Sequence, residues 1–134
     1  MGYFNADADE VRTEWLKNHD GDDHAMRLLD NLIYVDDKTN RWTAPKGSII
    51  DGASIPRFLW SFIGSPFTGD YRRASIIHDV YCENKEETWQ NTHKVFREIM
   101  LHDGVSKWKA RLMFWAVWRF GPRWKKPNLS SYGQ

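Results

Sequence analysis

Residues 51–81 read DGASIPRFLWSFIGSPFTGDYRRASIIHDVY, and the interpretation of the whole chain starts from this stretch. Asp51 is followed by a glycine, and Pro56 comes soon after, so the stretch opens as a sharp turn. Residues 57–63 then have the pattern of a short amphipathic helical turn, and residues 64–69 read as a loop.

The second half of the stretch has a helical period. Ala74, Ile77 and Tyr81 recur at spacings of three and four, which predicts a helix over residues 71–84 with Asp70 as its N-cap. That helix carries a His-Asp pair at positions 78 and 79 directly after two isoleucines. Reactive side chains inside apolar sequence make this pair the first candidate site.

Two further helices follow. Residues 86–102 carry an apolar stripe, and Gly104 ends that helix. Ser106 is then predicted to cap a helix over residues 107–120, which Gly121 and Pro122 terminate. The short connection between the first two helices predicts that they pack antiparallel.

The first 50 residues favour β-structure. Residues 11–17 alternate apolar and polar side chains, as a short strand does, and residues 25–35 are also β-leaning. Residues 32–35 and 41–44 are predicted to form a hairpin with a five-residue loop. The acidic residues 19–24 match no complete calcium-loop motif, and we interpret them as a solvated turn.

The fold class that follows is α+β: a small antiparallel β-sheet precedes a three-helix half. We predict a single domain over residues 1–134, with a β-rich part (1–50), a helical part (51–124) and a tail (125–134).

Composition narrows the class of protein. A mean hydropathy of −0.68 indicates a soluble chain, although aromatic residues make up 15% of it. Cys82 is the single cysteine, so no intrachain disulfide forms, and we predict a small buried apolar role for it. The N-terminus lacks the pattern of a signal peptide. The longest apolar run, residues 112–118, is far shorter than the roughly 18 residues of a membrane span.

Charge is segregated along the chain. Residues 1–37 hold ten acidic and three basic side chains, whereas residues 104–134 hold seven basic and no acidic ones. This asymmetry suggests either self-complementary docking or a basic face for an anionic partner.

Four residues are candidates for one site. Asp51 precedes a glycine that exposes backbone carbonyls, and a carboxylate with bare carbonyls is what calcium prefers. His78 and Asp79 point about 100° apart on a helix, so one can face a substrate while the other reaches an ion. His93 follows on the next helix, where antiparallel packing brings it beside His78.

A structural interpretation stands beside this one. His78 can be a core histidine bonded to a carbonyl, and Asp79 can pair with Arg72, Arg73 or Lys94. The turn at residues 51–54 is then a capped turn without chemistry.

Two resemblances bear on the choice. Over roughly residues 33–120, the segments PKGSIIDGASIPRFLW, RRASIIHDVY and KVFREIM resemble, in this order, an uncharacterised family of small proteins encoded by phages and prophages. A narrower series is similar to bacterial phospholipases of the secreted A2 class. That series consists here of Asp51-Gly52, Ser54, Pro56, Gly64, Phe67, Ala74, His78-Asp79, His93 and Phe96.

The second resemblance implies roles for these residues. His78 would be the general base that activates a water, and Asp79 and Asp51 would hold a calcium ion that polarises the ester carbonyl. His93 stands where that class has an aspartate that orients the base. The expected tyrosine is displaced to Tyr81, and the disulfides of the secreted enzymes are absent.

The C-terminal third offers a second candidate surface, because tryptophans alternate there with basic residues. Its members are Trp108, Lys109, Arg111, Trp118, Arg119, Arg123 and Trp124. Such a composition suits a bilayer interface or a protein partner, and less well nucleic acid. In the alternative interpretation the tryptophans belong to the core. Residues 112–117 are apolar nearly all round, which predicts that this helix is largely buried.

Three functions follow. The first is a phage-type protein that hydrolyses a phospholipid ester with calcium. The second is a virion or assembly component that docks other phage proteins through the same scaffold. The third is a transition-metal hydrolase that uses Asp51, His78, Asp79 and His93 for zinc or iron. The expected location is the virion or the cytoplasm of an infected bacterium.

Overall fold

The computed structural model describes residues 2–5, 11–16, 25–52, 54–63, 69–125 and 127. Its described strands form two three-stranded antiparallel sheets, ordered β1-β4-β5 and β2-β3-β6. The strands are β1 (Tyr3–Phe4), β2 (Thr13–Trp15), β3 (Met26–Leu28), β4 (Leu32–Val35), β5 (Arg41–Ala44) and β6 (Ile49–Ile50). Three longer helices follow the strands, so the α+β class is confirmed, although with two small sheets instead of one.

The β4–β5 hairpin has the predicted bounds. Leu32 pairs with Ala44 and Tyr34 with Trp42, and all four side chains face the core. The turn is held by the Asp36 carboxylate, which accepts bonds from the backbone N–H groups of residues 38 and 40 and from the Trp42 indole. Alternating burial and a side-chain-capped turn therefore explain why this register is stable.

The helical half begins with the 3₁₀ turn η2 (Arg57–Leu59) and the short helix α1 (Trp60–Ile63), as predicted for residues 57–63. A second 3₁₀ turn, η3 (Gly69–Tyr71), precedes α2 (Arg72–Asn84). Asp70 lies inside that turn and Tyr71 is the residue before the helix, so the prediction of Asp70 as N-cap is wrong. The chain enters α2 through a tighter 3₁₀ turn and needs no side-chain cap there.

The next two helices are α3 (Trp89–His102) and α4 (Lys107–Phe120). Helix α3 starts three residues later than predicted, because the Thr88 hydroxyl accepts a bond from the Asn91 N–H and sets the cap there. The bounds of α4 match the prediction, and Ser106 precedes it, but the Ser106 side chain forms no capping hydrogen bond.

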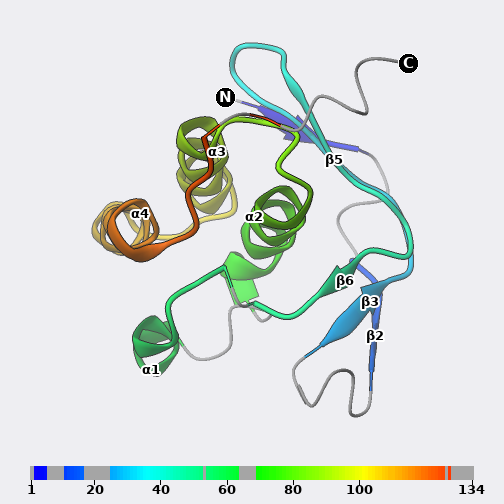
Figure 1. Ribbon diagram of the computed structural model, residues 1–134, viewed down its shortest axis with the longest axis horizontal. Helices are drawn as coiled ribbons and strands as arrows, with labels where there is room; N and C mark the ends of the chain where they lie inside the picture. The colour runs from blue at the N-terminus through cyan, green and yellow to red at the C-terminus, as the bar shows by residue number, and fades with distance from the viewer. Residues whose placement is uncertain are drawn as a thin grey trace.

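Helix α2 is the centre of the molecule. Figure 1 shows it between α3 on one side and the strands on the other, and it packs against α3, β5 and β6. Arg73 near its start pairs with Asp103 after α3, and His78 meets His93, so α2 and α3 run antiparallel as expected. All nine residues from Ala74 to Cys82 are buried because α2 is covered on every side.

Helix α4 is exposed along one face. Its buried residues are Ala110, Met113, Ala116 and Val117, while the Trp115 side chain is 51% exposed. The prediction of a largely buried helix is therefore wrong. The helix packs mainly on α3, so an apolar side chain such as Trp115 remains on its outer face.

Several sequence-based interpretations fall outside the described residues. They concern the acidic turn at 19–24, the loop residues 64–68 with the motif positions Gly64 and Phe67, and most of the tail. Within the residues that the structure does describe, no helix is long and apolar enough to cross a membrane.

Candidate functional site

Two buried histidines form the centre of the site. His78 in α2 and His93 in α3 are both fully buried, and the Nε2 of His78 lies 2.8 Å from the Nδ1 of His93. The Nε2 of His93 in turn lies 3.0 Å from the backbone oxygen of Pro122, after α4. The predicted convergence of these two residues is therefore confirmed, with a partner in Pro122 that local sequence patterns did not indicate.

The carbonyl of Pro122 determines where the protons lie. A carbonyl only accepts, so the Nε2 of neutral His93 carries the proton and donates to it. The Nδ1 of His93 then has a lone pair, and His78 donates its Nε2–H to that lone pair. As a result the free lone pair of His78 is on Nδ1, which faces the turn before η2.

Ser54 completes this chain of hydrogen bonds. Its Oγ lies 3.1 Å from the Nδ1 of His78, and the tautomers above make the serine hydroxyl the donor. The turn that carries Ser54 has Gly52 at a positive φ of 74°, and the N–H of Ile55 bonds back to the Gly52 carbonyl. Sequence patterns mark Ser54 only as a motif position, because its contact with His78 joins two separate segments.

Asp79 anchors the same turn. Its Oδ2 accepts a 3.2 Å hydrogen bond from the backbone N–H of Asp51. Burial, and then the nearby Asp51 carboxylate, raise the pKa of Asp79 to about 6, and hydrogen bonds from Asp51 and Ser54 partly oppose that rise. Asp51 and Asp79 are thus neighbours as predicted, while the ion pair of Arg73 is formed with Asp103 and not with Asp79.

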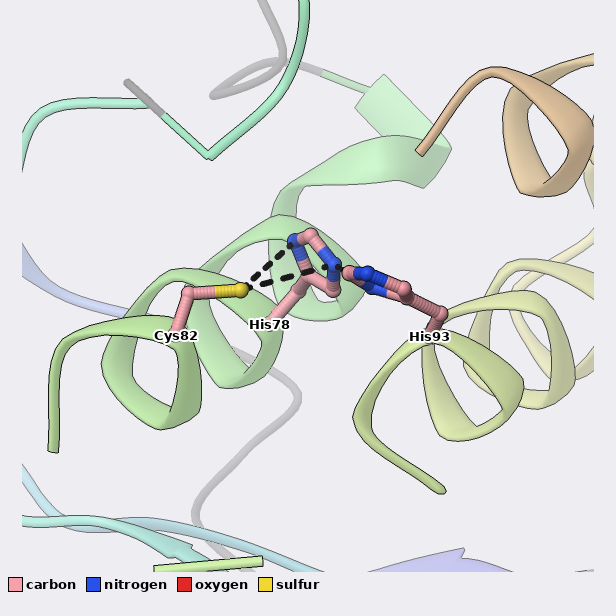
Figure 2. Close-up of side chains that lie close together, drawn as sticks. All are labelled: His78, Cys82 and His93. Carbon is pink, nitrogen blue, oxygen red and sulfur yellow. Dashed lines mark hydrogen bonds between the residues drawn. The ribbon is translucent and has the colours of Figure 1, made fainter. Parts of the chain in front are cut away.

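Cys82 adds a third side chain that could bind a metal ion. It lies one turn after His78, and its Sγ is 3.7 Å from the Nε2 and 3.9 Å from the Nδ1 of that ring (Figure 2). Burial is the largest cause that raises the pKa of the Cys82 thiol, followed by the charge of Asp79. The expected burial of Cys82 is confirmed. Its position beside the imidazoles was missed: the spacing of four residues shows that His78 and Cys82 share a face of the helix, but not which residues that face contacts.

The surroundings keep both histidines neutral. Burial lowers the pKa of His93 to about 4 and lowers that of His78 well below its usual value, with the neighbouring His93 as the second cause for His78. The Phe96 ring lies 4.5 Å from the His78 ring, and the Trp89 ring lies 5.7 Å from that of His93. An apolar wall of this kind excludes the water that would stabilise an imidazolium.

A scan against protein-family models matches residues 26–117 to DUF1353, described as a protein of unknown function. The chain belongs to this family. The DUF1353 match contains Ser54, His78, Cys82 and His93, so the site described above lies in the family's domain, with Pro122 just beyond the matched residues.

Two curated relatives of this DUF1353 protein come from Sinorhizobium fredii strain NGR234, and both are described as uncharacterized. The protein y4jT is 44% identical over 99 residues, which cover 74% of this chain and 30% of the relative. The protein y4iH is 46% identical over 104 residues, which cover 78% of this chain and 44% of the relative. The chain thus spans less than half the length of both. No solved structure matches significantly.

The proposed C-terminal surface of the DUF1353 protein divides into two parts. Trp118 and Trp124 are partly buried: the Trp118 ring packs 4.7 Å from Trp89, and the Trp124 indole donates to the Glu87 carbonyl. Arg123 covers the Trp89 ring at 4.6 Å. Of these residues, Trp118 lies beside His93, with its ring 6.4 Å from the imidazole. The exposed members of the surface are Trp108, Lys109, Arg111, Arg119 and Arg123.

The residues that could bind metal also divide into two groups. Among the described residues, one group of three potential metal ligands lies close enough together to hold an ion, and it consists of His78, Cys82 and His93. Asp51 and Asp79 are not in it, so the predicted set of Asp51, His78, Asp79 and His93 does not form one cluster. Asp51 and Asp79 are neighbours, joined by the bond from the Asp51 N–H to the Asp79 carboxylate, but two carboxylates are fewer than the roughly six to eight oxygen ligands that calcium takes.

Proposed function

We propose that this DUF1353 protein is an ester hydrolase in which His78 is the general base. One observation carries the proposal: the continuous chain of hydrogen bonds from Ser54 through His78 and His93 to Pro122. It leaves a lone pair on the Nδ1 of His78 and aims that lone pair at a hydroxyl group. A histidine held in this tautomer can accept a proton from an attacking hydroxyl.

The attacking group in this proposal is a water that takes the place of the Ser54 hydroxyl. Ser54 is also within hydrogen-bond reach of Asp79, so its hydroxyl can turn away and leave the Nδ1 of His78 to a water. The water oxygen bonds to the ester carbonyl carbon as its proton passes to Nδ1. The same proton then goes to the departing alcohol when the C–O bond breaks.

His93 supports the base differently from a carboxylate. It accepts the Nε2–H of His78 with a neutral lone pair, so it orients the ring without adding a negative charge. When His78 gains a proton, its Nε2 proton can pass to His93, whose own Nε2–H is held by the Pro122 carbonyl. The positive charge is then shared by two imidazoles.

The resemblance to secreted A2 phospholipases suggests the substrate class and the cation. The substrate would be a phospholipid ester. Asp51 and Asp79 would hold calcium beside the base, where the ion would polarise the ester carbonyl. The adjacency of the two carboxylates supports this, since a cation between them would relieve their repulsion.

A second candidate is a non-enzymatic virion or assembly component. The observation that favours it is the complete burial of both imidazoles, which gives a substrate no exposed ring to approach. In this case the hydrogen-bonded chain is a structural polar core that joins α2, α3 and the segment after α4. A phage origin and a location in the particle or the infected cell belong to this proposal too.

The two candidates are separated by a hydrolysis assay on the purified chain. Release of fatty acid from phospholipid vesicles and of alcohol from a short-chain ester is measured with calcium and with a chelator. We expect His78→Gln to lower the rate by at least about 100-fold, the contribution typical of a general base. His102→Gln is the matched control, because His102 lies at the end of α3 outside the site.

Hydrolysis at the wild-type rate in His78→Gln would contradict the role of His78. No hydrolysis of either substrate by the folded wild-type protein would remove the enzymatic proposal. Co-purification of that inactive protein with phage particles would then support the assembly role.

A further inference from the structure

Three side chains of the buried site place potential metal ligands close together. His78, Cys82 and His93 each offer one ligand atom, and these three atoms all lie within 4.8 Å of one another. Figure 2 shows the cysteine and the first histidine on α2 and the second histidine reaching in from α3. We infer that these three side chains form a binding site for a zinc-class divalent metal ion, with one thiolate and two imidazole ligands.

The outer partners of the two imidazoles suit such a site. The Nε2–H of His93 donates to the Pro122 carbonyl, which directs its Nδ1 lone pair inward whether or not a metal is bound. His78 needs the tautomer with its proton on Nδ1, and the Ser54 hydroxyl is placed to accept it. Ser54 can then donate to the Asp79 carboxylate, which is also in reach. Metal-binding histidines usually donate their second N–H to a carbonyl or a carboxylate-linked group in this way.

The spacing of the donors shows what metal binding must change. Ligands about 2.0–2.1 Å from a tetrahedral ion lie roughly 3.3 Å apart, whereas the two nitrogens are 2.8 Å apart with a proton between them. The sulfur is 3.7 Å from the Nε2 and 3.9 Å from the Nδ1 of His78, so it lies beside the ring and not along the Nε2 lone pair. To reach the roughly 3.6 Å thiolate–imidazole arrangement on zinc, the Cys82 side chain or the His78 ring must also rotate. The ion would therefore replace the shared proton, push the rings apart by about half an ångström and release the thiol proton.

The donor types choose the metal. Sulfur and imidazole nitrogen suit zinc, cobalt and similar ions, and they do not suit calcium, which takes oxygen ligands. Three protein ligands leave a fourth tetrahedral position for a water or another small ligand. This site therefore uses one sulfur and two imidazole nitrogens, whereas the calcium site would use the carboxylates of Asp51 and Asp79.

One consequence rests on the proposed function. With a metal on Nε2 and a proton on Nδ1, His78 has no lone pair left for a substrate. The metal-bound form would then be inactive in ester hydrolysis, and a zinc-selective chelator, with calcium kept in excess, would restore the rate. The metal site itself needs no hydrolytic activity to exist.

Cobalt(II) is the probe for the test, because a thiolate bound to cobalt gives a charge-transfer absorption that nitrogen and oxygen ligands do not give. The full chain is freed of metal with a chelator, and cobalt is then added to the folded protein and, since the donors are buried, during refolding from urea. We expect one cobalt per chain, a thiolate charge-transfer band and loss of that band when zinc is added.

Cys82 is the only cysteine, so Cys82→Ala should abolish the band, while His102→Gln should leave it unchanged. If the wild-type protein shows no charge-transfer band after either treatment, the inference is overturned, whatever the variants do. An unchanged absorption in Cys82→Ala would overturn it as well. Hydrolysis is assayed separately with calcium in excess and a zinc-selective chelator present, so an inactive protein with a cobalt–thiolate band would refute the proposed function and support the metal site.

Discussion

Among the single residues of the site, His93 has the largest effect on its chemistry. It accepts a hydrogen bond from His78 with a neutral ring nitrogen and so adds no charge. A buried carboxylate at this position would stabilise an imidazolium on His78. The neutral imidazole of His93 offers no such charge, so burial is free to lower the pKa of both rings. The same neutrality frees two lone pairs for a metal.

Tyr34 and Glu98 provide a test of electrostatics away from the site. The buried Tyr34 hydroxyl donates to the Glu98 carboxylate, and burial raises the pKa of Glu98 while that bond lowers it. Tyr34→Phe should therefore destabilise the fold most where Glu98 is ionised. We expect a loss of ~2 kcal/mol at neutral pH, as for a hydrogen bond to a charged group, and a smaller loss as the pH falls and Glu98 is protonated.

The free energy of unfolding in urea, measured at pH 7 and pH 4, checks this expectation. Tyr3→Phe is the control, because the Tyr3 side chain is exposed and should give no loss at either pH. If Tyr34→Phe lowered the free energy of unfolding equally at pH 7 and pH 4, the ionised form of Glu98 would not be the one that the Tyr34 hydrogen bond stabilises.

Among the elements, α2 is unusual in being buried on all faces. The sheets cover one side through β5 and β6, α3 covers another, and the Asp51–Ser54 turn bonds to Asp79 and His78. Tyr81 also accepts the backbone N–H of Thr43 in β5 and fixes the helix against the hairpin. A helix held this firmly is a rigid base for the two donors that it carries.

The helix caps give a prediction at this level. The Thr88 hydroxyl accepts the Asn91 N–H at the start of α3, whereas Ser106 before α4 makes no such bond. Thr88→Ala should cost about 1 kcal/mol of unfolding free energy, the usual value of a lost cap. Ser106→Ala is the matched control and should cost much less. Urea unfolding of both variants measures the difference, and equal costs would show that the caps do not distinguish the two helices.

At the scale of the whole molecule, three exposed aromatic side chains gather where η2 meets the end of α4. The Phe120 ring lies 5.8 Å from Phe58 and 5.7 Å from Trp115, and all three side chains are about half exposed. Helix α4 also carries four basic residues and no acidic one. Exposed aromatic rings with bases of one sign are typical of a surface that contacts anionic lipid.

We therefore predict that the protein binds vesicles that contain anionic lipid more tightly than zwitterionic ones, and that salt weakens this binding. Trp115→Ser should reduce binding at least several-fold, because an interfacial aromatic side chain is lost. Trp15→Ser on β2 is the control, since Trp15 is also exposed, at 65%, but lies in the β2-β3-β6 sheet. Vesicle co-sedimentation measures both, and equal effects of the two substitutions would contradict a specific surface on α4.

The sequence by itself determined much of the local structure. The β4–β5 hairpin and α4 have the predicted bounds, and the meeting of His78 with His93 followed from two amphipathic helices with a short connection. These features depend on side-chain periodicity and turn residues, which act over a few positions along the chain. The differences are at the helix starts, where a 3₁₀ turn replaced the Asp70 cap, in the division of the strands between two sheets, and in the exposed face of α4.

The tertiary structure alone decided the chemistry of the site. Ser54 and Pro122 meet the two histidines across 24 and 29 residues of chain, and they set the protons on both rings. Cys82 is a potential metal ligand because of the way α2 packs in the fold, and Trp118 lies in the wall of the site because its face of α4 packs against α3. Which face of a helix is covered depends on long-range packing, and a local pattern of apolar residues does not contain that information.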